Sequence, residues 1–197
     1  MNDLDPAIED DATVFRDVLT LTLLGFVTIV VLLLPHLNPP QAQTSAKPAG
    51  NVVVEARWAE GLRSDVDLWV RGPGDRPVGY SRKSGAVFDL LRDDLGASRN
   101  LTDFNYEFAF SRGAPAGEYV VNLHLYGAKG EPLPITVSVV ISLRDPDTGR
   151  LSEIAAREVD LARQGEEITV LRFRLGENGV LLPGSLNRLP KPLRQTG

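Results

Sequence analysis

An uncharged, strongly apolar segment near the N-terminus constrains this chain more than any other feature. The seventeen residues from Val18 to Leu34 carry no charge. Extension back to Val14 gives about 20 helical residues, enough to cross a hydrocarbon core of about 30 Å. Pro35 is expected to end the helix, so we predict a transmembrane helix over residues 14–35. The alternative is a cleaved signal peptide, which would begin with a basic segment and have a shorter apolar core. The acidic start favours an uncleaved anchor.

The charge of the chain is concentrated in its N-terminal tail. Residues 1–17 hold six acidic residues and one arginine, whereas residues 18–197 hold 20 residues of each sign, so the net charge of −5 belongs to the tail. We expect residues 1–13 to form an acidic cytoplasmic tail. Residues 36–50 are rich in Pro, Ala, Gln and Ser and are expected to form a linker.

The charges beside the predicted helix give little information on its orientation. Arg16 stands on one side, against Lys47 and Arg57 on the other. A single span followed by a β-rich domain is, however, the usual layout of a bacterial envelope protein. We therefore expect an inner-membrane protein with a cytoplasmic N-terminus and a periplasmic C-terminal domain.

Composition excludes several classes of function. The chain has no cysteine, which excludes thiolate nucleophiles, disulfides and cysteine-ligated zinc. Its two histidines, His36 and His124, leave little room for a histidine metal site or a Ser-His-Asp triad, and His124 is expected to be packed or half-buried. Without a basic excess we expect no nucleic-acid partner. No catalytic constellation is evident, so we expect a non-enzymatic protein without a resident metal or cofactor.

Hydrophobic alternation with a period of two begins at Asn51 and predicts an all-β domain. The alternating segments are residues 51–57, 65–70, 106–110, 118–126, 135–143, 151–161 and 168–175. Seven or eight strands at this spacing are typical of an antiparallel β-sandwich, and we predict a jelly-roll-like one over residues 51–182. Residues 152–163 also suit a helix, but their alternation favours a strand. Residues 183–197 contain three prolines and are expected to form an extended, loosely docked tail.

Polar residues mark one face of the predicted transmembrane helix. Asp17 directly precedes the uncharged run. At about 100° per residue, Thr20, Leu24 and Thr28 lie within about 60° of Asp17. The acid either lies in the headgroup region or has a function. A helix surrounded only by lipid needs no such face, whereas a helix inside a partner bundle can use it as a proton site.

The helix resembles the transmembrane segment of the smaller subunits of ion-driven motors, the ExbD/TolR/MotB class. The shared pattern is Asp17-Val18 at the start of an apolar helix, followed by Phe26. The resemblance implies that Asp17 carries protons, and that Thr20, Leu24 and Thr28 face a pore. It also implies a helix dimer inside a pentamer of a larger multi-pass subunit. The C-terminal part departs from this class, since it has neither the small α/β domain nor the peptidoglycan-binding domain of its members.

A second resemblance covers part of the predicted sandwich. Its segments are Ser-Asp-Val-Asp-Leu-Trp-Val at 64–70, Arg-Asp-Asp at 92–94, Asn-Tyr-Glu at 105–107 and Gly-Ala-Pro-Ala-Gly-Glu-Tyr-Val-Val at 113–121. In this order they resemble an uncharacterised bacterial β-sandwich family that is similar to galactose-binding-like and pre-peptidase C-terminal domains. The resemblance implies a fold rather than a function.

Acidic and aromatic residues supply a candidate ligand face on the sandwich. Its members are Asp65, Asp67, Trp69, Asp93 and Asp94, and Glu107 is a further carboxylate of the type that calcium binds. Asp65 and Asp67 share a strand face, opposite the one that holds Val66 and Leu68. Without an Asp-x-Asp-x-Asp-Gly loop, we expect a solvated face and keep calcium as the alternative. The aromatic residues Trp58, Trp69, Tyr80 and Tyr126 suit either sugar stacking or core packing.

Two hypotheses of function follow. The first is a non-catalytic subunit of a proton-driven motor of the 5:2 type, with Asp17 as proton carrier and a sandwich that contacts an envelope polymer or protein. The second is a membrane-tethered periplasmic binding or scaffolding module, in which the helix is only an anchor. The face formed by Asp17 and the threonines favours the motor subunit. The sandwich by itself is explained by the tethered module.

Overall fold

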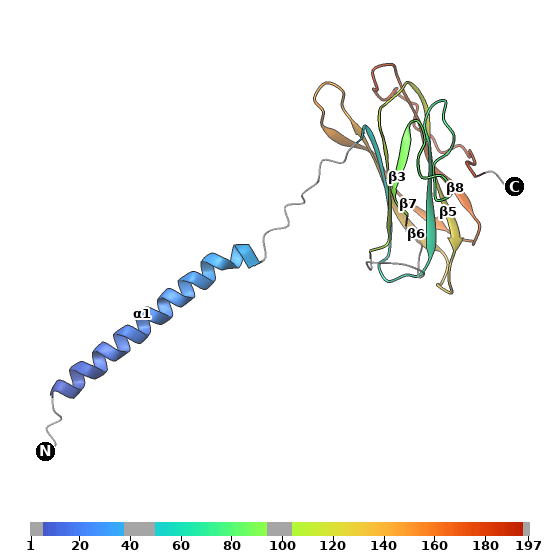
Figure 1. Ribbon diagram of the computed structural model, residues 1–197. Coiled ribbons are helices and arrows are strands. Elements are labelled where there is room, and N and C mark those ends of the chain that lie inside the picture. Colours follow the sequence, from blue (N-terminus) through green and yellow to red (C-terminus); the bar gives the residue numbers. More distant parts are fainter. Residues whose placement is uncertain (1–5, 38–49, 94–103, 195–197) are drawn as a thin grey trace. The chain divides into compact units, whose positions relative to one another are not determined.

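The computed structural model describes residues 6–37, 50–93 and 104–194, with helix side chains described over residues 13–32 (Figure 1). The chain divides into an N-terminal unit, Met1–Lys47, and a C-terminal unit, Pro48–Gly197. Most of the predicted linker lies outside the described residues, as does Asp94.

The described part of the N-terminal unit is one helix, α1 (Pro6–Leu37). It is longer than the predicted 14–35. Proline suits the first turn of a helix, and Pro6 opens α1. The helix also continues through Pro35, which disturbs only its last turn. Its segment Thr13–Leu32 is long and apolar enough to cross a membrane, and equally suits a signal sequence.

The described part of the C-terminal unit contains eight strands in two sheets. They are β1 (Val52–Trp58), β2 (Asp65–Arg71), β3 (Phe88–Arg92), β4 (Tyr106–Ser111), β5 (Gly117–Gly127), β6 (Ile135–Arg144), β7 (Leu151–Leu161) and β8 (Glu167–Leu175). One sheet has the order β3-β4-β1-β6-β7 and the other β2-β5-β8. All neighbouring strands are antiparallel. The prediction of an antiparallel sandwich is confirmed.

The core lies between the two sheets and consists of the inward residues of each alternating strand. Val54 of β1, Leu68 of β2 and Leu123 of β5 are fully buried there. Near one end, the Tyr119 ring stacks on Phe173 with centroids 5.0 Å apart and meets Phe88 edge-on at 6.0 Å. These aromatic contacts join strands of both sheets, so the sandwich holds together without a disulfide.

Two strands differ in how well the sequence predicts them. β7 pairs with β6 along its whole length, which confirms the strand over the alternative helix at 152–163. β3 was not among the predicted segments. Its register shifts between Leu90 and Arg92, and the intervening Leu91 is 71% exposed. This irregularity removes the alternation that would have marked β3 in the sequence.

Candidate functional site

The outer face of the three-stranded sheet is covered by a C-terminal segment, residues 185–194, which we call the strap. At its start, Asn187 pairs with Arg172 of β8 through two backbone hydrogen bonds of 2.8 and 2.9 Å. Further on, the Lys191 amide donates to Thr169 Oγ1 at 2.9 Å. Leu193 is 4% exposed and packs with Trp69 and Val120. The strap is therefore bonded to the sheet through its backbone and through Leu193, where the sequence suggested only a loosely docked tail.

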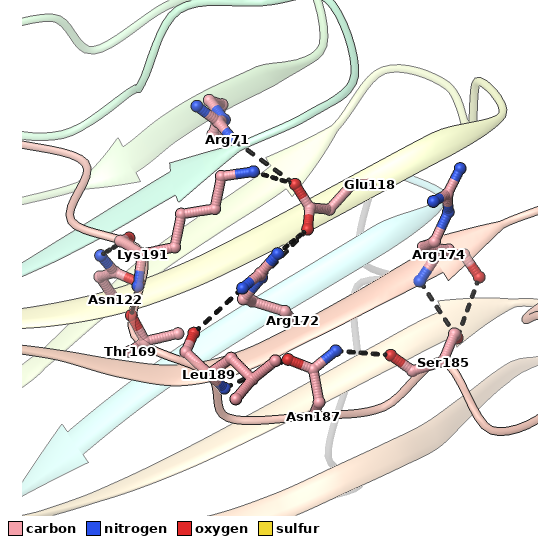
Figure 2. A network of polar contacts seen from close by, with 10 residues as sticks. All are labelled: Arg71, Glu118, Asn122, Thr169, Arg172, Arg174, Ser185, Asn187, Leu189 and Lys191. Atoms are coloured by element: carbon pink, nitrogen blue, oxygen red, sulfur yellow. Dashed lines mark hydrogen bonds and ion pairs between the residues drawn. The ribbon is translucent and has the colours of Figure 1, made fainter.

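Glu118 of β5 ties the strap to the sheet by charge. Figure 2 shows its carboxylate between Arg172 of β8 and Lys191 of the strap, with Arg71 Nη2 at 3.6 Å. Partial burial alone would raise the pKa of Glu118. The hydrogen bonds and charges of Lys191 and Arg172 outweigh it and hold the pKa below its usual value. The strap is therefore held in part by an ionised carboxylate.

Beside this network, a buried polar chain runs from β2 through β5 to the strap. Asp67 Oδ2 lies 2.7 Å from His124 Nδ1, and His124 Nε2 contacts the guanidinium of Arg194. A guanidinium only donates hydrogen bonds, so Nε2 accepts, and the ring proton lies on Nδ1 and is donated to Asp67. His124 is 2% exposed and Asp67 is 3% exposed. His124 is thus buried as expected, with partners that the sequence did not reveal.

Three carboxylates meet at the edge of β2. One oxygen from each of Asp67, Asp93 and Glu107 lies within 4.8 Å of the others. Glu107 comes from β4 of the other sheet, is fully buried, and accepts a 2.5 Å hydrogen bond from the Leu68 amide. Asp93 follows β3 and pairs with Lys83 at 2.9 Å. Burial raises the pKa of Asp67 above its ordinary value, with the charge of Asp93 adding to it, although His124 opposes the shift.

This carboxylate cluster has the ligand chemistry of a hard cation but an incomplete set of ligands. Calcium takes six to eight oxygens, and the cluster offers three side chains. Each of them already has a protein partner: His124, Lys83 or the Leu68 amide. One buried oxygen, Asp93 Oδ1, has no hydrogen-bond partner among the described residues. The arrangement can hold a proton, or a weakly bound divalent ion, between the sheets.

The structure brings together only part of the predicted ligand face. Asp67 and Asp93 lie in the carboxylate cluster, whereas Trp69 packs under the strap. Asp65 and Asp67 do share the face opposite the core, but both are buried, so the expectation of a solvated face is wrong. Asp67 is enclosed by His124, which Arg194 of the strap contacts, and by Asp93 and Glu107; alternation within one strand cannot indicate these neighbours. Glu107 is the member that joins the second sheet to the site.

The threonines on the predicted polar face of α1 form hydrogen bonds within the helix itself. Thr20 Oγ1 donates to the Arg16 carbonyl at 2.7 Å, and Thr28 Oγ1 donates to the Leu24 carbonyl at 2.8 Å. Thr22, on another face, bonds to Val18 in the same way. Threonine hydroxyls that bond to the preceding turn need no partner helix. Asp17 therefore remains the residue of this face that favours a partner.

Comparisons with protein-family models, with curated proteins and with solved structures return no match to this chain.

Proposed function

We propose that this chain is a non-catalytic, single-span protein of the bacterial inner membrane that holds its β-sandwich in the periplasm as a binding or scaffolding module. The observation that carries the proposal is the exposure of every side chain of Thr13–Leu32. Lipid removes apolar surface of this length from water. The hydroxyls of Thr20, Thr22 and Thr28 are satisfied within the helix, so an anchor surrounded by lipid leaves these three paired.

The absence of native cysteine gives a direct test of topology. Arg157→Cys places a thiol at an exposed position of β7, and Asn2→Cys places one in the N-terminal tail. A membrane-impermeant maleimide applied to spheroplasts should label the first variant, and the second only after permeabilisation. Labelling of Asn2→Cys alone would reverse the orientation. Mass spectrometry of the membrane-extracted protein should give the complete chain, and a mass that lacks the helix would identify a signal sequence.

Asp17 favours a second, more specific candidate: the proton-carrying subunit of an ion-driven motor of the 5:2 type. The side chain belongs to the apolar segment Thr13–Leu32, where an ionisable group is costly unless it lies at the interface or is used. In this role two α1 helices lie inside a multi-pass oligomer, and Asp17 takes up and releases protons. The sandwich then contacts an envelope polymer or protein.

The two candidates predict different behaviour of Asp17 variants. In a motor, Asp17→Asn should abolish complementation of a deletion strain while leaving assembly intact, because asparagine keeps the size but cannot exchange a proton. Asp17→Glu should retain part of the activity, and Asp11→Asn in the tail serves as the matched control. Purification in mild detergent should then recover a multi-pass partner. A lone chain together with a silent Asp17→Asn would leave the anchored module.

A further inference from the structure

A second surface site lies beside the strap, on the far side of Trp69 from the core. It is a pocket of about 350 Å³ between the end of β2, the following loop and the strap. Its lining residues are Trp69, Arg76, Pro77, Tyr80, Ser81, Arg82, Leu193 and Arg194. This volume is at the lower end of the range for small-molecule sites. None of the lining residues is acidic.

The loop that forms one wall is built against the Trp69 indole. Val78 pairs with Val70 of β2 through backbone hydrogen bonds of 2.9 and 2.8 Å, and Gly79 pairs with Arg82. A Cβ at Gly79 would lie 2.5 Å from the indole, so only glycine allows this approach. The Tyr80 ring meets Trp69 edge-on at 5.6 Å and stays 39% exposed. The wall therefore combines a fixed indole with an accessible aromatic ring.

The pocket is lined by more hydrogen-bond donors than acceptors. Arg76 is exposed, Arg82 reaches Asp75 only at 3.7 Å, and Arg194 contacts His124. Two buried donors, Trp69 Nε1 and Arg82 Nη1, have no hydrogen-bond partner among the described residues. A buried donor without a partner is costly and uncommon. The guanidinium groups that line the pocket suit a ligand that supplies acceptors.

We propose that this pocket binds a carboxylated sugar. The carboxylate pairs with the guanidinium groups, whose planar forks match it. The sugar ring lies against the exposed Tyr80 ring, beside the Trp69 indole. An anion without a ring would leave the aromatic wall unused, and a neutral ring would leave the arginines unpaired. The inference rests on the proposed function in treating the sandwich as the binding part of an anchored module.

The two tryptophans of the chain make the site directly observable. In the full chain, labelled with ¹⁵N-tryptophan and held in detergent micelles, the indole N–H groups of Trp69 and Trp58 give two signals. Trp58 is a core residue whose Nε1 likewise has no hydrogen-bond partner in the described part of the chain, so it serves as the internal control. Methyl β-D-glucuronide should shift the Trp69 signal and leave the Trp58 signal in place. Methyl β-D-glucoside, which differs only in the carboxylate, should bind at least about tenfold more weakly.

Variants of the arginines separate binding from folding. Arg76→Gln, at an exposed side chain, and Arg82→Gln should each weaken glucuronide binding about tenfold. Arg157→Gln on β7 should leave it unchanged, and an unmoved Trp58 signal reports an intact fold. No Trp69 shift up to about 20 mM glucuronide, equal binding of the glucoside, or an equal effect of inorganic phosphate would each overturn the proposal. These outcomes are independent of the maleimide-labelling test. Failure of glucuronide binding does not affect the proposed membrane anchor, and failure of the labelling test does not affect the proposed pocket.

Discussion

Removing the charge of Glu107 while keeping its shape should stabilise the sandwich. Glu107→Gln retains an oxygen that accepts from the Leu68 amide. Its new amide group can donate to Asp67 or Asp93, whose oxygens lie within 4.8 Å of the carboxylate that it replaces. A repulsive neighbour thus becomes a hydrogen-bond donor without a change in volume.

The size of the effect follows from the spacing of the three carboxylates. The three oxygens lie within 4.8 Å of one another, and two unit charges at that separation would repel by about 3.5 kcal/mol at an effective dielectric constant of about 20. The substitution relieves the repulsion toward Asp67 and Asp93, in part already offset by His124 and Lys83. It weakens the bond from the Leu68 amide by about 1 kcal/mol, because that bond loses its charged acceptor. We expect a net gain of about 1–3 kcal/mol at neutral pH.

Thermal unfolding followed by circular dichroism in the presence of EDTA measures this gain. Each kcal/mol should raise the midpoint by about 2–4 °C for a domain of this size. The gain should fade as the pH falls, because protonation of Asp67, whose pKa is raised by burial, relieves the same repulsion in the parent chain. Glu158→Gln, exposed on β7, is the control and should change little. A loss of more than about 1 kcal/mol in Glu107→Gln would refute the electrostatic reasoning.

Three further outcomes are expected. Millimolar calcium should stabilise the sandwich by less than about 1 kcal/mol, since each clustered carboxylate already has a partner; a midpoint rise of many degrees, lost in Glu107→Gln, would instead identify a metal site. Leu193→Ala should cost about 2–4 kcal/mol in local stability of the strap, measured by hydrogen exchange. Leu189→Ala, exposed within the same strap, should cost little, and equal effects would show that Leu193 is not the anchor. The pKa of Glu118 is held below its usual value of 4.5, so its ion pairs stabilise the strap fully at higher pH and progressively less as the pH falls below that value. Strap amides should therefore exchange faster in acid. Glu118→Gln should remove that dependence, and a strap that stays protected in acid would contradict it.

Alternation within single strands predicted the sandwich well, because burial on one face leaves a period-two record in the sequence. It also placed Asp65 and Asp67 on a common face. It could not predict what covers that face, because the strap has no alternation and reaches the sheet through backbone bonds and Leu193. The carboxylate cluster was equally hidden. Its members come from β2, β4 and the end of β3, and only the pairing of the sheets brings them together.

The helix shows a different limit of sequence reasoning. Its apolar length was evident, and so was the shared face of Asp17, Thr20 and Thr28. Whether a threonine hydroxyl needs a hydrogen-bond partner outside the helix depends on its side-chain rotamer, which cannot be deduced from the sequence. In the structure, the preceding turn accepts the hydroxyls of Thr20, Thr22 and Thr28. The same residues therefore fit a lipid-facing helix as well as a bundled one.

The strap also sets an order in which the molecule can mature. Residues 185–194 leave the ribosome after all eight described strands. Until they arrive, Trp69 lacks its Leu193 cover, His124 lacks Arg194, and Asn122 lacks the Lys191 carbonyl. A nascent chain can therefore pair its strands while one face of the smaller sheet still exposes groups that will be buried. Completion of that face therefore follows the pairing of the strands, and a chain that stops before residue 185 would leave Trp69 and Val120 without their Leu193 cover.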